Sequence, residues 1–219
     1  ASDTAVEDIP LAPGKTLAAV HAFARAADAA SQGETIRAKI DALARQGATV
    51  IVASEAFGVD APEGERFVMD LAREKGLFAT GGHEVSRLYG LKTRTRTAVI
   101  NGSLIPKMME TADMTENSVR RSGITAPLLI MRCDGGVMAA DEVRRRPILT
   151  MLSGLAAGVA GALMYEKMSN GIFLESGGTS TDISVVRDGR VMARGGELGG
   201  HKLYLRSLDV RTLGVAGGS

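Results

Sequence analysis

One stretch in the last quarter of the chain strongly limits how the chain can fold. Two β-prone runs, residues 171–174 and 183–186, flank the sequence ESGGTSTD at residues 175–182. The dipeptide Asp188-Gly189 then separates the second run from a third. Asp-Gly between such runs is the strongest short-range signal for a β-hairpin. The pattern therefore predicts three successive antiparallel strands, with residues 175–182 forming the tight turn between the first two.

The turn itself carries groups that suit a phosphate and a cation. Its two glycines allow positive φ angles and the close approach of a ligand, and successive N–H groups of a turn can form an anion-binding concavity. Hydroxyl groups can hydrogen-bond phosphate oxygens, and a carboxylate can hold hydrated Mg²⁺. From these residues alone, a purely structural turn is the alternative interpretation. The residues concerned are Gly177, Gly178, Thr179, Ser180, Thr181 and Asp182.

Size and composition exclude several classes of protein. A chain of 219 residues suffices for one or two domains. The net charge of +1 gives no electrostatic case for nucleic acid or an anionic membrane, and 4% aromatic residues without Trp argue against a base-stacking platform. A single cysteine, Cys133, excludes an internal disulfide and favours a reducing, cytoplasmic compartment. No apolar run is long enough to span a bilayer, so we predict no membrane segment.

The first half of the chain alternates helical and strand patterns. Residues 34–46 and 62–75 have helical periodicity, whereas residues 48–53 and 77–80 are apolar, strand-like runs. This order predicts an α/β fold with a mostly parallel sheet, in which ligands bind at the carboxyl ends of the strands. The Ala-rich residues 16–30 are a further candidate helix.

Polar candidates follow the second of these strands. His83 and Glu84 are a possible base with its orienting carboxylate, or a metal pair. Because adjacent side chains point in different directions, a surface loop is the alternative. Residues 92–98 alternate cations with hydroxyls, which suits either a carboxylate clamp or a solvated helix start. We expect a second helical piece at residues 114–121.

Another carboxylate follows the apolar strand pattern of residues 127–132. Asp134, before two glycines, is a candidate metal-water contact or general base, and a plain β-turn competes with that interpretation. Cys133 has no clear activating base beside it, so we interpret it as a core residue. Residues 153–165 are rich in small side chains and predict a buried helix that approaches another backbone closely, with Ser153 as its N-cap.

Four segments, in this order, resemble the hydantoinase A / 5-oxoprolinase family. They are residues 94–99, 130–136, 153–158 and 177–182, and residues 217–219 at the chain end agree as well. The helix followed by the hairpin is also similar to the same pair in the chaperone ATPases. The resemblance extends from about residue 48 to the end and rests on several independent motifs.

The resemblance implies a partial α/β, actin-like ATPase (ribonuclease H-like) fold. Residues 1–92 would be the C-terminal part of a first actin-like domain, and residues 93–219 would begin a hydantoinase A-type domain. It also implies ATP and Mg²⁺ as cofactors, a cyclic amide of the hydantoin or 5-oxoproline type as substrate, and a B-type subunit in a hetero-oligomer. Because no first Asp-x-Gly-Gly-Thr hairpin precedes residue 48 and both ends look cut, we expect a fragment that binds ATP poorly by itself.

The resemblance further assigns residue roles. Asp134, Asp182 and Glu175 would be catalytic, and Asp182 and Asp134 would hold the metal. The turn residues would contact phosphate: Gly177, Gly178, Thr179, Ser180 and Thr181. The chain departs from the family pattern at Glu175, where Asp is expected, and at Leu155, where Pro is expected. The longer Glu side chain would displace a metal–water contact.

Two other functions compete with ATP-dependent ring opening. One is an ATP-dependent carboxylase subunit, and the other is a non-catalytic actin-like module, which the unusual Glu175 keeps open. For the full-length protein we expect Asp182→Ala to abolish ATP turnover without unfolding it. We expect Gly178→Val to impair folding, because β-branched residues tolerate positive φ badly.

Overall fold

The computed structural model describes residues 5–24, 33–167 and 169–217. The chain divides into two compact units, which are described one at a time. Unit 1 contains Ala1–Thr111, Arg144–Ile148 and Glu197–Leu205, and unit 2 contains Ala112–Val143, Leu149–Gly196 and Arg206–Ser219. This division differs from the predicted family-domain ranges 1–92 and 93–219, which stay a prediction.

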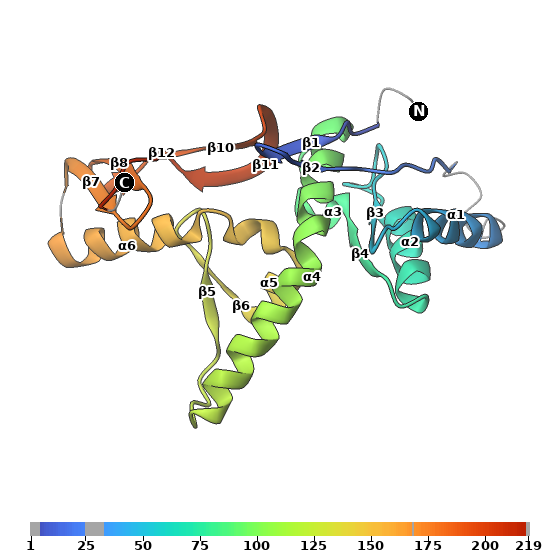
Figure 1. The fold of residues 1–219 in the computed structure, drawn as a ribbon, viewed down its shortest axis with the longest axis horizontal. Coiled ribbons are helices and arrows are strands. Elements are labelled where there is room, and N and C mark those ends of the chain that lie inside the picture. Colours follow the sequence, from blue (N-terminus) through green and yellow to red (C-terminus); the bar gives the residue numbers. More distant parts are fainter. Residues whose placement is uncertain (1–4, 25–32, 168, 218–219) are drawn as a thin grey trace. The chain divides into compact units, whose positions relative to one another are not determined.

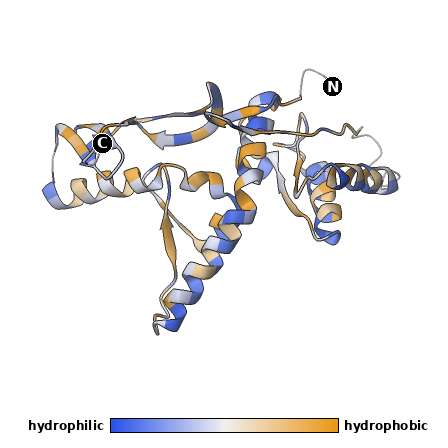
Figure 2. Cartoon of the chain, in the orientation of Figure 1, coloured by the Kyte–Doolittle hydropathy of each residue, from blue (hydrophilic) through white to orange (hydrophobic). Residues whose placement is uncertain are grey.

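Unit 1 is an α/β arrangement around two parallel strands, as its alternating sequence pattern predicted (Figure 1). Its elements are β1 (Ile9–Ala12), β2 (Lys15–Leu17), α1 (Gly33–Arg45), β3 (Val50–Ala53), α2 (Glu63–Glu74), β4 (Phe78–Gly81) and α3 (Gly82–Val85). β3 and β4 pair in parallel from Val50↔Phe78 to Ala53↔Gly81, so their carboxyl ends coincide. In Figure 2, α1 carries both hydrophilic and hydrophobic residues, as an amphipathic helix should. The core cluster is Ile36, Ile40, Ile51, Leu71 and Ala72.

The Ala-rich helix expected at residues 16–30 is not present where the structure can test it. Thr16 and Leu17 belong to β2, which pairs antiparallel with β1, and residues 18–24 form no regular element. The remainder, residues 25–30, lies outside the described residues.

One long helix, α4 (Leu91–Arg121), replaces the separate helical pieces that the sequence suggested. Pro106 lies inside it and removes one backbone N–H donor. Thr and Ser side chains along the helix bond back to carbonyls one turn earlier, for example Thr97 Oγ1 to Thr93 O at 2.8 Å. The helix continues past Pro106 to Arg121.

Unit 2 is built around an antiparallel sheet and one helix rich in small residues. Its elements are β5 (Leu129–Met131), β6 (Val137–Ala139), α6 (Ser153–Glu166), β7 (Gly171–Ser176), β8 (Thr181–Arg187), β9 (Arg190–Val191) and β12 (Val210–Leu213). The main sheet has the order β12-β8-β7, and β9 pairs with β8. α5 (Ala140–Arg145), the 3₁₀ turn η3 (Pro147–Thr150), β10 (Ala193–Leu198) and β11 (His201–Leu208) belong partly to each unit.

The helix predicted at residues 153–165 is present as α6, but the predicted burial is wrong, since only Ala156 and Val159 of this helix are buried. Its start also differs. Leu152 occupies the N-cap with φ 62°, and no side chain caps the helix. Ser153 is the first helical residue, so the predicted Ser153 cap is wrong.

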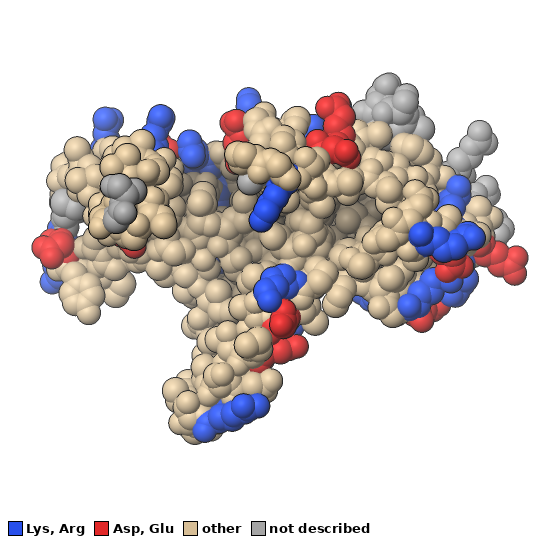
Figure 3. Space-filling view, viewed as in Figure 1, with Lys and Arg blue, Asp and Glu red and all other residues tan. Residues whose placement is uncertain are grey.

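Charge is dispersed on the surface shown in Figure 3. Basic and acidic side chains lie there in small separate groups, in line with the net charge of +1. Among the described residues, no helix combines the length and the apolar character needed to cross a bilayer.

Candidate functional site

The hairpin predicted from ESGGTSTD is present in unit 2. β7 and β8 pair antiparallel from Gly171↔Val186 to Ser176↔Thr181, and β8 pairs in turn with β9. The second turn has φ 49° at Asp188 and φ 68° at Gly189, as an Asp-Gly turn of the primed type requires. The three successive antiparallel strands are therefore confirmed.

The first turn, residues 177–180, exposes a row of backbone N–H groups. Gly177 N donates to Ser180 O at 2.9 Å, which closes the turn. Within the described part of the chain, the N–H groups of Gly178, Thr179 and Ser180 have no hydrogen-bond acceptor, and neither do the hydroxyls of Thr179 and Ser180. Successive unpaired turn amides bind anions. The turn therefore offers a phosphate group up to three backbone donors and two hydroxyls.

The conformation expected for the two glycines is wrong. Neither Gly177 nor Gly178 has a positive φ, and a Cβ added at Gly178 would meet no atom within 4 Å. A glycine permits positive φ but does not require it. The expectation that Gly178→Val impairs folding through backbone strain therefore loses its basis.

Gly178→Ala is expected to change the free energy of unfolding by less than about 0.5 kcal/mol, the usual range for an exposed position without special geometry. Gly189→Ala is the matched control on the next turn, where φ is +68°. A left-handed backbone costs a residue with a Cβ about 1–2 kcal/mol, so this variant should be destabilised. Urea titration of both variants measures the difference, and equal losses would contradict the assigned turn geometry.

The last two residues of the motif point to opposite faces of the sheet, because side chains alternate along a strand. Thr181 Oγ1 donates to Val215 O at 2.6 Å and also contacts Ser176 Oγ at 2.8 Å. Asp182 lies on the other face, is 6% exposed, and accepts a hydrogen bond from Thr212 Oγ1 at 2.6 Å. Both residues belong to β8 rather than to the turn, so Asp182 is anchored in the sheet.

Glu175 and Asp182 form a cross-strand pair on β7 and β8. Residues opposite each other on antiparallel strands share a face, and like charges there repel each other. A hydrated cation would offset that repulsion, and Mg²⁺ commonly uses one or two carboxylates while keeping several waters. Among the described residues, no group of three or more His, Cys, Asp and Glu side chains could hold a metal ion. The pair thus fits a hydrated Mg²⁺ but not a closed protein cage.

α6 approaches this face of the hairpin at a glycine, as its small residues predicted. A Cβ at Gly158 would lie 3.0 Å from Phe173 Cζ and closer still to Glu175 Oε2. Figure 1 shows α6 running beside β7. Because Gly158 has no side chain, the Glu175 carboxylate has room to lie against α6.

Gly158→Ala is expected to destabilise the chain by about 1–3 kcal/mol, because overpacking forces neighbouring side chains to move. Gly161, in the same helix, has open space where its Cβ would be. Gly161→Ala should therefore stabilise α6 by up to about 1 kcal/mol through helix propensity. The two free energies of unfolding test the close contact, and a stabilising Gly158→Ala would refute it.

Asp134 lies in a different hairpin, between β5 and β6. Its Oδ2 forms an ion pair with Arg132 at 2.6 Å, and its Oδ1 accepts from Gly136 N at 3.1 Å. Gly135 has φ +86°, so the turn uses its glycine for a left-handed conformation. The carboxylate supports its own β-turn, which favours the structural interpretation. Its catalytic and metal roles stay predictions.

Cys133 is a core residue, as interpreted from sequence. It is 1% exposed, and its Sγ donates to Arg206 O at 3.3 Å. Burial raises the pKa of the thiol above its ordinary value, and the charge of Asp134 raises it further. A thiol held in its protonated form is a poor nucleophile.

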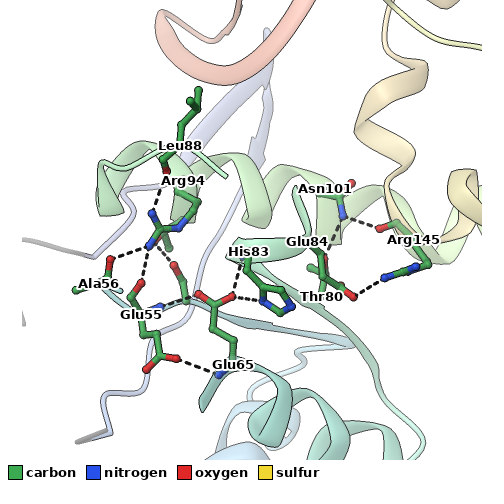
Figure 4. Close-up of polar contacts among 12 residues, drawn as sticks. Glu55, Ala56, Glu65, Thr80, His83, Glu84, Leu88, Arg94, Asn101 and Arg145 are labelled. Carbon is green, nitrogen blue, oxygen red and sulfur yellow. Dashed lines mark hydrogen bonds and ion pairs between the residues drawn. The ribbon is translucent and has the colours of Figure 1, made fainter. Parts of the chain in front are cut away.

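Unit 1 contains a polar cluster that sequence reasoning identified only in part (Figure 4). Arg94 is completely buried and donates to Leu88 O at 3.0 Å, Glu55 O at 2.5 Å and Ala56 O at 3.2 Å. It is therefore neither the solvated helix start nor the carboxylate clamp considered above. Its three acceptors are backbone carbonyls, which it uses to fix the loop after β3.

His83 and Glu84 do not form a pair. His83 Nδ1 contacts Glu65 Oε2 at 2.6 Å, whereas Glu84 forms an ion pair with Arg145 at 3.1 Å. Glu65 was missed because it lies on α2, 18 residues earlier, and only the tertiary fold brings it to His83. One feature of the sequence could have indicated this contact. A parallel pair of strands brings the residues that follow each strand to the same edge of the sheet.

Comparison with solved structures identifies the fold of the chain. A nucleotide-free structure of acetone carboxylase superposes with a TM-score of 0.72 at 22% identity, over 84% of this chain and 27% of that one. An ATP-dependent caprolactamase from Pseudomonas jessenii gives a TM-score of 0.70 at 28% identity, over 84% of this chain and 28% of that one. These structures confirm the predicted partial α/β fold of the actin-like ATPase type.

The family follows from the sequence comparisons. The model of the family described as hydantoinase/oxoprolinase matches residues 94–219, and the chain belongs to this family, as the motifs predicted. Caprolactamase subunit alpha of Pseudomonas jessenii is 27% identical over 190 residues, which cover 84% of this chain. A 5-oxoprolinase of Saccharomyces cerevisiae is 31% identical over 135 residues, which cover 59% of this chain.

The chain corresponds to only part of each of these relatives. It spans 27% of the caprolactamase subunit and 10% of the 5-oxoprolinase. The motif segments at residues 94–99, 130–136, 153–158 and 177–182 lie inside the matched family region. Of the terminal motif, Gly217 is described, whereas residues 218–219 lie outside the described residues.

Proposed function

We propose that the protein to which this chain belongs is an ATP-dependent hydrolase of cyclic amides, acting as the A-type subunit of a hetero-oligomer. The observation that carries the proposal is the row of unpaired N–H groups at Gly178, Thr179 and Ser180. It supports phosphate binding at the same turn that the family resemblance assigned to ATP. Family membership and the caprolactamase and 5-oxoprolinase relatives support the choice of a cyclic amide as substrate.

The roles proposed for the residues follow from their geometry. The turn amides of residues 178–180 would hold the phosphate oxygens, and Glu175 with Asp182 would hold Mg²⁺ through water. ATP would supply the phosphoryl group that turns the poorly reactive amide oxygen into a good leaving group. Fixed N–H donors and a metal stabilise the charge that develops during such a transfer. The Thr181 hydroxyl donates to Val215 O, so this hydrogen bond would have to break before the hydroxyl could donate to phosphate.

The function is tested on the full-length protein together with its B-type subunit. ADP release and product formation are measured with hydantoin, 5-oxoproline, caprolactam or a ketone, each with and without bicarbonate. We expect ADP release that depends on one of the cyclic amides and is independent of bicarbonate. A requirement for bicarbonate and a ketone would favour the carboxylase alternative, and weak ATP turnover that no substrate changes would favour the non-catalytic module.

The chain by itself is proposed to bind ATP poorly, because the N–H groups and hydroxyls of the turn would contact phosphate oxygens alone. Isothermal titration calorimetry of the 219-residue chain with Mg-ATP tests this point, and tight binding would refute it.

A further inference from the structure

Two segments of unit 2 lie side by side at one end of its main sheet. The last pair between β8 and β12 is Thr181↔Leu213, so the chain leaves β12 beside the turn of residues 177–180 (Figure 1). Residues 214–217 are called the post-β12 segment below. Its Val215 O accepts from Thr181 Oγ1 at 2.6 Å, and the point where a Gly217 Cβ would be lies 3.8 Å from Gly177 O. The turn and the post-β12 segment are therefore in contact, and both belong to unit 2.

The post-β12 segment carries unused backbone donors. Among the described residues, the N–H groups of Gly214, Val215 and Gly217 have no hydrogen-bond acceptor. All three residues are exposed. The adjoining turn has three further unpaired N–H groups, at residues 178–180. Since unpaired turn amides bind anions, this end of the sheet offers an anion donors from two segments.

Neither conformation nor packing explains the glycines of the post-β12 segment. Gly214 and Gly217 both lack a positive φ. A Cβ at Gly214 would meet no atom within 4 Å, and one at Gly217 would make only an ordinary contact. Gly177 and Gly178 in the turn are alike in both respects. A further use of glycine is to let a ligand approach the backbone closely, and these four glycines lie among the same unpaired donors.

Thr181 holds the post-β12 segment against the turn. Val215 O can only accept, so the single proton of the Thr181 hydroxyl lies toward it. Ser176 Oγ, 2.8 Å away, therefore donates to Thr181 Oγ1 in turn. This bond fixes a segment that lies 34 residues later in the chain, so Thr181 positions donors without contacting phosphate itself.

We propose that the post-β12 segment completes the phosphate site of the turn, that the two segments together hold a diphosphate group, and that Thr181 is the positioning residue. This inference rests on the proposed function, and it specifies that the two terminal phosphates of ATP occupy the site. A terminal phosphate presents three acceptor oxygens, which the three N–H groups of the turn match. The three N–H groups of the post-β12 segment then serve the neighbouring phosphate.

The test uses the full-length protein with its B-type subunit, and inorganic pyrophosphate and inorganic phosphate as probes. ADP release is measured over a range of ATP concentrations with each probe. We expect both to compete with ATP, and the inhibition constant of pyrophosphate to be about tenfold lower or more, as additional charge-assisted hydrogen bonds predict. Amide hydrogen exchange at residues 178–180 and 214–217 should slow when pyrophosphate is added.

The combined variant Gly214→Ala, Gly217→Ala places two methyl groups beside the donors of the post-β12 segment. The fold has room for both, so the melting temperature should not change. The inhibition constant of pyrophosphate and the KM for ATP should rise about tenfold or more. Gly195→Ala is the matched control, because Gly195 in β10 also lacks a positive φ and has open space at its Cβ position. It should leave both constants at their wild-type values.

Two substitutions of Thr181 test the positioning role. Thr181→Val removes the hydroxyl, so the post-β12 segment loses its bond to β8. We expect the KM for ATP to rise about tenfold while kcat changes little, because a binding segment is affected rather than the phosphoryl transfer. Thr181→Ser keeps the hydroxyl and should restore the wild-type KM, which it could not do if the lost methyl packing were the cause. Without ligand, exchange at residues 214–217 should be faster in Thr181→Val than in wild type.

The outcomes separate this inference from the proposed function. If pyrophosphate slows exchange at residues 178–180 but not at 214–217, or if the combined alanine variant keeps the wild-type inhibition constant, the role of the post-β12 segment is overturned while the hydrolase function stands. Equal inhibition by phosphate and pyrophosphate would overturn the diphosphate assignment, and an unchanged KM in Thr181→Val would overturn the positioning role. ADP release that no cyclic amide stimulates, in a protein whose two segments both respond to pyrophosphate, would overturn the hydrolase function and leave the phosphate contacts in place.

Discussion

Asp182→Asn in the full-length protein is expected to reduce ATP turnover by about 10²–10³-fold, in the range seen when one electrostatic contact to a transition state is removed. The substitution keeps an oxygen that can accept from Thr212 Oγ1, as Asp182 does at 2.6 Å. It removes the negative charge that would hold hydrated Mg²⁺ beside Glu175. ADP release at saturating ATP measures the effect, and melting temperature checks that the fold is retained.

The structure also changes what is expected of Asp182→Ala. The sequence places Asp182 in the turn, which predicts that this variant folds normally. Asp182 is instead a buried position of β8, so alanine would leave Thr212 Oγ1 without its acceptor. We now expect a loss of about 1–3 kcal/mol in the free energy of unfolding. Asn is therefore the better test of function.

Asp188→Asn is the matched control for charge. Asp188 has φ 49° in the turn between β8 and β9, and Asn tolerates this left-handed conformation as well as Asp does. The control should keep full ATP turnover. Wild-type turnover in Asp182→Asn would remove Asp182 from the proposed site.

The hairpin could be predicted from sequence because its signals are local. Asp188-Gly189 dictates a tight turn, and the apolar runs on either side dictate the strands. The opposite orientations of Thr181 and Asp182 were available from the same pattern, since side chains alternate along any strand. The prediction treated both as turn residues and so placed their side chains together.

Backbone conformation at the turn could not be predicted in the same way. Gly177 and Gly178 lack positive φ, whereas Gly135 and Gly189 have it. Composition shows where a left-handed residue is permitted, but hydrogen bonds across the turn decide which glycine uses that freedom. For the same reason, the sequence alone could not show that Asp134 forms an ion pair with Arg132 in its own hairpin.

The partners of the unit 1 cluster depend on tertiary structure alone. The spacing of Glu65 and His83 indicates no contact, because most of α2 and the strand β4 lie between them along the chain. Arg94 looked solvated because its neighbours in sequence are polar. Its burial follows from packing of the first turns of α4 against the ends of β3 and β4, which only long-range contacts establish.

The burial of Arg94 leads to the second large effect: Arg94→Ala is expected to lower the free energy of unfolding by about 3–5 kcal/mol, because it removes a buried charged donor and leaves several acceptors unpaired. The side chain is 0% exposed and supplies donors to the carbonyls of Leu88, Glu55 and Ala56. Alanine would leave a cavity and three carbonyls without this donor. Urea titration of the 219-residue chain measures the loss.

Arg66→Ala, on the exposed side of α2, removes the same charge from the same unit. It should change the free energy of unfolding by less than about 0.5 kcal/mol, as exposed substitutions usually do.

Arg94→Lys should resemble Arg94→Ala more than wild type, because an ammonium group cannot reproduce the planar set of donors. Hydrogen exchange should also quicken at Gly58 N, which bonds to Glu55 O in the loop that Arg94 holds. A loss below about 1 kcal/mol in Arg94→Ala would contradict this account, because a buried group that leaves its acceptors unpaired costs more than that when removed.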